Sequence, residues 1–158
     1  MIKDKKSNGA NLGFEEKLWK AADKMRNNMD AAEYKHVVLG LIFLKYISDA
    51  FKERYETLYK EISDSKSSLY IREERTRYET LNDPDEYKSE NKFYVPEKAR
   101  WDYLKTKTQN IGDAINKAND LLEEENPENL QNVLSVVDFN DKDRLPDHIL
   151  SQLINHFS

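Results

Sequence analysis

The strongest constraint on the fold is one long apolar repeat in the first half of the chain. Apolar side chains recur at steps of three and four residues: Tyr34, Val37, Leu41, Leu44, Ile47, Phe51, Tyr55, Leu58 and Ile62. This spacing places them on one face of a helix about eight turns long, which should end within residues 63–68. Residues 37–44 are apolar on nearly every face, so other helices should surround them. A membrane span needs roughly 20 such residues, so this stretch is predicted to be a buried core helix.

A second helix is predicted directly before this one. Asp30 and Glu33 have the spacing of a capping box at the start of the long helix, with Asp in place of the usual Ser or Thr. The preceding helix should close at Asn27 and Asn28. The apolar face of this preceding helix comprises Phe14, Leu18, Ala22, Met25 and Met29. Residues 1–10 are unpatterned and predicted to be a disordered tail.

The middle of the chain is less regular. Residues 71–81 favour a charged helix, and residues 82–85 (NDPD) are typical of a turn. Residues 93–95 (FYV) are β-prone but short, so we expect an extended segment here, with half of a small hairpin as the alternative. Pro96 suits the first position of a short helix that reaches about Lys107. Its inward-facing residues are Trp101 and Leu104.

Three more helices are predicted towards the end of the chain. The first spans residues 111–125, Pro127 opens the second, and Pro146 opens the third after a loop at residues 140–144. Their apolar faces comprise Ile111, Ile115, Ala118 and Leu122; Leu130, Leu134 and Val137; and Ile149, Leu150, Leu153, Ile154 and Phe157. The sequence therefore predicts an all-α, multi-helix bundle-like domain over residues 11–158, with at most one small extended or hairpin element.

Composition limits the possible functions. The chain has 158 residues, of which 38% are hydrophobic and 11% aromatic, enough for one domain with a core of its own. It has no Cys, which excludes disulfides and thiolate metal sites, and its first ten residues carry no secretory signal, so a cytoplasmic location is expected. The net charge of −5 weighs against bulk nucleic-acid binding by this chain alone.

No residue pattern for catalysis, cofactor binding or metal binding is present. The glycines, Gly9, Gly13, Gly40 and Gly112, form no glycine-rich phosphate or cofactor loop. Gly40 is interpreted as a site of close helix packing, with a hinge as the alternative. The histidines, His36, His148 and His156, lack metal-ligand spacing. Residues 123–125 (EEE) are interpreted as a solvated helix end rather than an acid–base site.

Two groups of basic residues are candidate contacts for DNA or a partner subunit. The first comprises Arg72, Arg75 and Arg77, with Tyr70 and Tyr78 among them. The second comprises Lys98, Arg100, Lys105 and Lys107, around Trp101. Basic residues interleaved with aromatic ones can grip phosphates and stack on bases. In the first group Glu73, Glu74 and Glu79 intervene, which favours a solvated helix of mixed charge.

Several segments of the chain form a distinctive series in sequence order: residues 18–26 (LWKAADKMR), 29–35 (MDAAEYK), 38–49 (VLGLIFLKYISD), 93–101 (FYVPEKARW), 110–112 (NIG) and 133–139 (VLSVVDF). This series resembles the start of the modification (M) subunits of bacterial type I restriction–modification systems. The resemblance covers residues 12–158. Lys35, Lys45, Ser48 and Asp49 lie in these segments, and we interpret them as helix-capping and surface-pairing residues.

The resemblance implies an enzyme larger than this chain. Proteins of this family are adenine-specific DNA methyltransferases that use S-adenosylmethionine. Two M subunits join one specificity subunit, and restriction subunits can add to that core. Their catalytic half carries a glycine-rich motif and an Asn-Pro-Pro-Phe motif, and here Asn126 and Pro127 are followed by Glu128. We therefore expect the catalytic domain to follow residue 158 in a longer protein.

The expected function is that of a non-catalytic helical domain which helps to assemble the enzyme and to clamp DNA. The resemblance also implies a part in sensing the methylation state of the site. A stand-alone helical adaptor that binds only protein is the alternative, favoured by the acidic balance of the chain. An independent small enzyme has no supporting residue pattern.

Overall fold

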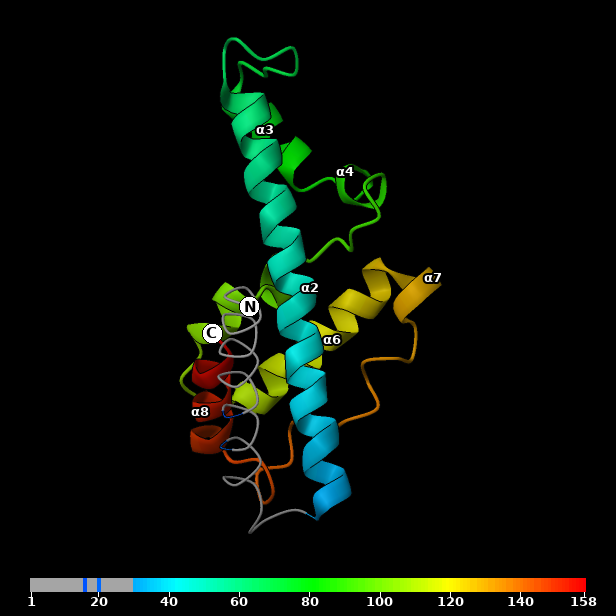
Figure 1. Ribbon diagram of the computed structural model, residues 1–158, viewed down its shortest axis with the longest axis vertical. Coiled ribbons are helices and arrows are strands. Elements are labelled where there is room, and N and C mark those ends of the chain that lie inside the picture. The colour runs from blue at the N-terminus through cyan, green and yellow to red at the C-terminus, as the bar shows by residue number, and fades with distance from the viewer. Residues whose placement is uncertain (1–15, 17–19, 21–29) are drawn as a thin grey trace, which may run out of the picture.

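The domain is built on one long helix, to which all the other elements are attached. The structure, a computed structural model, describes residues 16, 20 and 30–158. Helix α2 (Ala31–Ser63) forms the long axis in Figure 1, and at 1.5 Å per residue its 33 residues extend about 50 Å. Within the described ranges there are helices but no strands, so the predicted all-α class is confirmed.

Helix α2 follows the predicted apolar repeat along its whole length. The repeat's members Leu41, Leu44 and Ile47 are at most 1% exposed, and Leu58 and Ile62 are still buried near the other end. Asp30 occupies the N-cap position, but its side chain makes no capping hydrogen bond, so the predicted capping box is wrong. Its intended partner Glu33 instead forms an ion pair with Arg144, 2.6 Å away.

The predicted helix before α2 lies largely outside the described residues, as does the tail at residues 1–10. Glu16 and Lys20 are described, and both are helical. Their side chains form an ion pair of 3.5 Å, the usual pairing of residues four apart on a helix.

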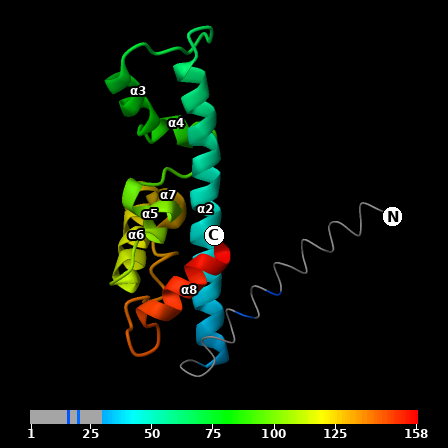
Figure 2. The same cartoon turned by 90° about the vertical axis from the view of Figure 1, so that its left-hand side faces the viewer.

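Two amphipathic helices complete the main core, with the predicted bounds. They are α6 (Ile111–Glu125) and α8 (Asp147–Phe157), and both bury the apolar faces expected from their periodicity, except that Phe157 is only half-buried. Figure 2 shows α8 crossing α2, while α6 lies on one side of it. The Asp147 carboxylate accepts hydrogen bonds from the backbone N–H groups of Asn110 and Ile111, at 3.1 and 3.0 Å. The first residue of α8 thereby caps the start of α6.

The elements between α2 and α6 are shorter than predicted. Helix α3 (Glu74–Leu81) starts three residues later than expected, and the predicted turn leads into an unexpected short helix, α4 (Asp85–Lys88). The helix expected from Pro96 to Lys107 is divided into a 3-10 turn, η1 (Glu97–Ala99), and α5 (Trp101–Lys105). Arg100 separates them because its backbone is extended (φ −73°, ψ 140°).

The helix predicted to open at Pro127 is also shorter. Helix α7 (Pro127–Leu130) ends where Gln131 takes an extended ψ of 125° and Asn132 a positive φ of 61°. A little further along, the backbone N–H groups of Leu134 and Ser135 donate to the Glu123 carboxylate at 2.8 and 2.9 Å. Glu123 thus holds the segment that follows α7. The interpretation of residues 123–125 as a solvated helix end is therefore wrong for this residue.

Residues 93–95, predicted to be extended with half of a hairpin as the alternative, lie outside every helix, and the described part of the chain offers them no partner strand. The buried side chain of Asn126 instead makes the hydrogen bonds that a partner strand would make. Its Oδ1 accepts from Tyr94 N at 3.2 Å, and its Nδ2 donates to Tyr94 O at 3.0 Å. One amide side chain therefore satisfies both backbone groups of Tyr94, as a neighbouring strand would.

Gly40 is a packing position, as interpreted from the sequence. A Cβ at Gly40 would lie 3.1 Å from Cζ of Phe139. The neighbour is a loop residue rather than another helix, and its ring is almost fully buried.

No described helix is long and apolar enough to cross a membrane.

Candidate nucleic-acid and subunit interface

The basic candidates separate into two groups at different heights on α2. We call residues 64–81 the tip, and it carries Arg72, Arg75 and Arg77. We call Lys98, Arg100, Lys105 and Lys107 the waist group, because η1 and α5 contact α2 near Ser48. The tip contacts α2 near Ile62, roughly 20 Å further along the axis at 1.5 Å per residue. Figure 2 shows α3 and α5 well apart beside α2, so the two groups do not form one patch.

The tip has a small core of its own. Leu58 and Ile62 of α2 pack with Leu81 of α3, and each is at most 3% exposed. The loop between the helices is tied back by Ile71 N, which donates to Ile62 O at 2.8 Å. Arg77 secures the same loop, because its Nη1 donates to the carbonyls of Ile71 and Arg72 at 2.9 and 3.0 Å. Arg77 is therefore a structural residue, and its guanidinium is already engaged.

The outer side of the tip presents basic and aromatic side chains to solvent. Arg72 is exposed, and the Arg75 side chain is 90% exposed and forms an ion pair of 3.1 Å with Glu79. Tyr70 and Tyr78 beside them are 40% and 63% exposed. An exposed ion pair contributes little to stability, so Arg75 can exchange Glu79 for another anion at small cost.

At the waist, Arg100 covers a cluster of aromatic rings. Phe51 stacks on Tyr87 with centroids 4.6 Å apart, and Tyr94 meets Phe51 edge-on at 5.7 Å. The Arg100 guanidinium lies 4.6 Å from the Phe51 centroid and 5.7 Å from that of Tyr55. These are cation–π distances, so the charge is stabilised by the rings it covers.

Hydrogen bonds fix Arg100 in this position. Its Nε donates to Val95 O at 3.0 Å, and Nη2 donates to Asn82 Oδ1 at 3.0 Å. Asn82 in turn donates to Tyr78 O, so the guanidinium links the waist to the end of α3. Burial raises the pKa of both Tyr87 and Tyr94 above the ordinary value, against a smaller lowering effect of Arg100. The two phenols thus stay neutral, and Arg100 acts as a structural residue.

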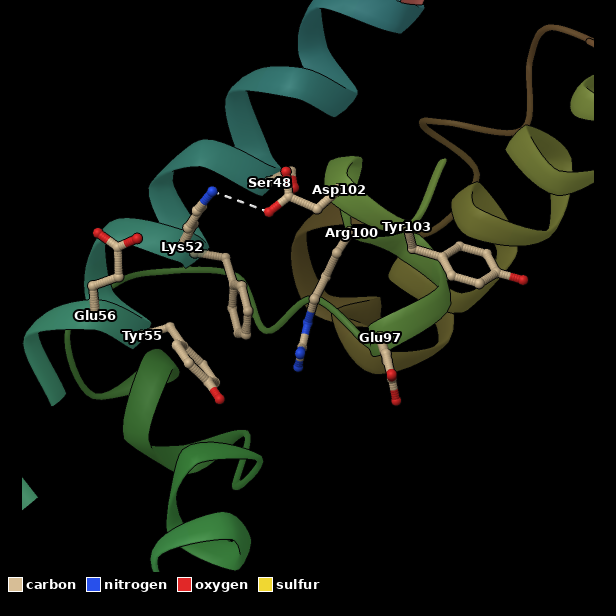
Figure 3. Close-up of a pocket in the computed structure, with 9 residues that line it drawn as sticks. Ser48, Lys52, Tyr55, Glu56, Glu97, Arg100, Asp102 and Tyr103 are labelled. Carbon is tan, nitrogen blue, oxygen red and sulfur yellow. Dashed lines mark hydrogen bonds and ion pairs between the residues drawn. The ribbon is translucent and has the colours of Figure 1, made fainter. Parts of the chain in front are cut away.

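A cleft of about 460 Å³ opens between α2 and α5 beside this cluster (Figure 3). Its bases are Lys52 and Arg100, and its acids are Glu56, Glu97 and Asp102. Lys52 Nζ donates to Asp102 at 3.0 Å, and this hydrogen bond is the main reason that the pKa of Lys52 is raised. Because carboxylates outnumber bases here, the cleft is a poor site for phosphate.

The other members of the waist group face solvent. Lys98 on η1 and Lys105 at the end of α5 are exposed. Lys107 lies over the Tyr103 ring at 4.9 Å, and its hydrogen bond to the phenol lowers the pKa of Tyr103. Of the candidates, the structure therefore leaves Arg72, Arg75, Lys98 and Lys105 available for an external partner, and it uses Arg77 and Arg100 internally.

The capping and pairing interpretation of the motif residues in α2 is confirmed for three of them. Lys45 and Asp49 form an i,i+4 ion pair of 2.6 Å. Ser48 is 5% exposed, and its Oγ accepts the backbone N–H of Trp101 at 2.7 Å, which caps the start of α5. Sequence reasoning missed the roles of Asn82 and Asn126, because their partners lie 18 and 32 residues away and no local spacing signals them.

No three His, Asp or Glu side chains of residues 16, 20 and 30–158 come together in a way that could hold a metal ion. Gly40 and Gly112 both lie within helices rather than in a loop. The described residues thus form an all-α domain whose exposed basic candidates lie partly at the tip and partly at the waist.

Comparison with known proteins identifies the family. The model of the HsdM N-terminal domain matches residues 14–157, which is nearly the whole chain. The chain belongs to this family, as the resemblance of its motifs predicts. It is 41% identical over 147 residues to the type I restriction enzyme MjaIX methylase subunit of Methanocaldococcus jannaschii. That alignment covers 92% of this chain and 26% of the relative, so the chain spans about a quarter of the relative's length.

Proposed function

We propose that this chain is the assembly and DNA-clamping domain of an adenine-specific type I DNA methyltransferase subunit. Membership of the HsdM N-terminal domain family supports the parent class. The relative is a methylase subunit of which this chain matches about a quarter, 26%. In this proposal the transfer of the methyl group from S-adenosylmethionine belongs to the remainder of the subunit. The domain's partners are DNA, the specificity subunit, a second M subunit and the restriction subunit.

The observation that carries the clamping role is the tip. Arg75 is on α3 and Arg72 is in the loop before it, and Figure 1 shows α3 beside the far end of α2, away from α6 and α8. Arginine at such a position contacts phosphate without reading sequence, and neighbouring tyrosines add contact area. With a net charge of −5, the domain alone should bind DNA weakly. Affinity then arises in the assembled enzyme, where the domain acts at high effective concentration.

The test uses the whole methyltransferase assembled with its specificity subunit. R72A/R75A should weaken binding to specific and non-specific DNA alike, and should reduce the slope of log affinity against log salt by about 2. K98A/K105A tests the waist group in the same assay. Lys60→Ala, an exposed change on α2 outside both groups, serves as the control. If both double variants bind DNA like the parent complex, the clamping role is wrong.

A second measurement addresses cofactor binding. Calorimetric titration of this 158-residue chain with S-adenosylmethionine should show no binding, because the sequence has no glycine-rich loop to approach the cofactor. Tight binding would overturn the assignment of a non-catalytic role.

The mixed charge of the tip favours one alternative, a protein–protein adaptor without direct DNA contact. Glu73, Glu74 and Glu79 are exposed beside Arg72 and Arg75, so a partner surface of mixed charge would also fit. In that case R72A/R75A would reduce co-purification of the specificity or second M subunit. The salt dependence of DNA binding by the complexes that still form would be unchanged.

A further inference from the structure

The segment between α7 and α8 is fastened to α6 at two points. The Glu123 carboxylate accepts the backbone N–H groups of residues 134 and 135, at 2.8 and 2.9 Å. Two turns earlier on α6, Asn116 Oδ1 accepts the backbone N–H of Phe139 at 2.9 Å. We call residues 133–139 the strap. The strap therefore runs antiparallel to α6, and its middle passes the part of the helix that lies between Asn116 and Glu123.

Asn119 lies on that part of α6, three residues after Asn116 and four before Glu123, and so shares their side of the helix. It is only 5% exposed, yet its side-chain amide makes no hydrogen bond with any of the described residues. The backbone of residues 136 and 137 in the strap makes none within the same ranges. Native proteins rarely leave a buried amide unpaired, because its desolvation costs free energy. Asn119 therefore marks a place where an external polar group can bind.

Two hollows meet at Asn119, which lines both of them. The first, of about 350 Å³, lies between α6 and the strap, and Asp120 and Asp138 contribute carboxylates to its lining. The second, of about 280 Å³, opens between the strap and α2 and has mainly apolar walls. The exposed members of those walls are Leu39, Phe43, Val133 and Val136, at 61%, 36%, 51% and 75%. We call the two hollows together the strap groove.

The lining of the strap groove restricts the kind of ligand that fits. Among the described residues, neither hollow is lined by Lys or Arg, and the first contains two carboxylates, so phosphate and nucleic acid are disfavoured. Large apolar side chains gathered on an exposed surface mark a contact with protein. A groove with apolar walls and few polar groups suits a peptide whose orientation those polar groups fix. The occupant should therefore be apolar, and neutral or basic.

The domain already shows how a buried asparagine binds extended backbone. Asn126, which is 4% exposed, accepts from Tyr94 N and donates to Tyr94 O. Asn119 carries the same acceptor and donor at a similar depth, 5% exposed. An extended segment that enters the groove would present one N–H and one C=O to Asn119 in the same way. Its side chains alternate in direction, so every second one would face the apolar walls.

We propose that the strap groove binds an extended apolar segment of a partner protein, whose backbone pairs with the Asn119 amide. The partner is a chain of different sequence in the assembled enzyme, so this inference deepens the assembly role proposed above and rests on it. A second copy of the domain is a poorer occupant. Its exposed apolar loop, Leu69–Ile71, already donates all three N–H groups to residues of its own chain.

The groove is separate from the DNA-clamping surface. Leu39 and Ile62, which mark the groove and the tip, are 23 residues apart on α2, roughly 35 Å at 1.5 Å per residue. The two proposals can therefore fail independently. If the parent methylase subunit does not bind its partner subunits at all, the assembly role itself is wrong. If it binds them and changes at Asn119 have no effect, only the groove is wrong.

Asn119→Leu separates binding from stability. Leucine is similar in size but has no polar group to leave unpaired, so the urea midpoint of this 158-residue chain should stay the same or rise. In the whole methylase subunit, the same change should weaken binding to the specificity or restriction subunit about tenfold or more, because the bound backbone loses both hydrogen bonds. Asn126→Leu is the matched control for stability, and its midpoint should fall.

Two results of this experiment overturn the proposal. Unchanged affinity for both subunits would show that Asn119 binds neither of them, and that water alone serves its amide. A midpoint that falls as far as that of Asn126→Leu would show that Asn119 is paired within the domain.

Photo-crosslinking in the assembled enzyme identifies the segment that occupies the groove. Benzoylphenylalanine replaces Val136 on the groove wall or, as the control, Tyr59, which is 51% exposed on α2 outside the groove. The Val136 position should crosslink to one apolar segment of the specificity or restriction subunit, and the Tyr59 position should not. Crosslinks to a methylase subunit, to a polar segment or to DNA would overturn the proposal, as would a yield no higher than that of the control.

Discussion

Replacing Gly112 with alanine should destabilise the domain far more than the same change at Gly40, although both glycines border Phe139. A Cβ at Gly112 would lie 2.0 Å from the backbone O of Phe139 and 2.9 Å from the Cα of Asn140. At Gly40 the nearest atom is the tip of the Phe139 ring, at 3.1 Å. A ring tip can shift by a few tenths of an ångström, whereas a backbone carbonyl takes its whole loop with it.

That loop has little freedom to move. Phe139 N donates to Asn116 Oδ1 at 2.9 Å, and Asn116 Nδ2 donates to Asp138 at 2.8 Å. Gly112 and Asn116 are four residues apart on α6 and therefore lie on the same face of the helix. Gly112 leaves room for the loop to approach this face, and Asn116 forms hydrogen bonds with it. Moving the loop would loosen Asn116 and lift the Phe139 ring, which is 1% exposed, from the core.

The size of the effect follows from these contacts. Overpacking a tight core costs about 1–3 kcal/mol, and complete loss of a buried Phe costs about 3–5 kcal/mol. Gly112→Ala should therefore lower the free energy of unfolding by about 2–4 kcal/mol. Gly40→Ala gains about 1 kcal/mol of helix propensity against a mild contact, so it should stay within about 1 kcal/mol of the parent.

Urea unfolding followed by far-UV circular dichroism measures both variants. The midpoint for Gly112→Ala should fall while the slope m stays constant, which separates lower stability from a change in the denatured state. Equal stability of the two variants would refute the reasoning, because it would mean that the loop at Phe139 yields as easily as the ring.

Three further predictions concern polar contacts. Asn126→Leu should lower the free energy of unfolding by about 2–3 kcal/mol in the same urea assay, because it leaves the buried N–H and C=O of Tyr94 unpaired; a neutral change would contradict the strand-like role of Asn126. Ser48→Ala should cost about 1 kcal/mol by removing the cap of α5, and Ser48→Thr should restore most of it if the added methyl group fits. Hydrogen bonds from Asn116 and the Asn140 backbone hold the pKa of Asp138 below its ordinary 3.8. Its stabilising effect is therefore complete above that value and lost as the pH falls through the lower folded pKa, and in acid titrations followed by circular dichroism Asp138→Asn should flatten this part of the pH dependence.

The parts of the fold that could be predicted from the sequence are those with a long local repeat. Helices α2, α6 and α8 each bury one apolar stripe, which periodicity predicts, and a turn or proline near their ends helped to set their bounds. The length of helix α7 was overestimated, because Leu130, Leu134 and Val137 have helical spacing. The backbone after α7 instead donates hydrogen bonds to the Glu123 carboxylate of α6. A contact with another element cannot be recognised from the local sequence.

The candidate site shows the same limit. Both basic groups are visible in the sequence, but nothing local separates the arginines that face solvent from those used internally. Arg77 is occupied by carbonyls of its own loop, and Arg100 by Asn82, Val95 and the aromatic rings. These contacts depend on how the loops fold back, which residue spacing does not encode.

The separate small core at the tip gives the domain two levels of cooperativity. Leu58, Ile62 and Leu81 hold α3 to the end of α2, whereas α6 and α8 share the large cluster around Leu41 and Phe51. With so few buried side chains, α3 should open without unfolding the rest, and its amide protons should exchange with deuterium sooner than those of α6. A ligand held by the tip would suppress that opening, so protection confined to α3 would report its binding even where the main core gives no signal.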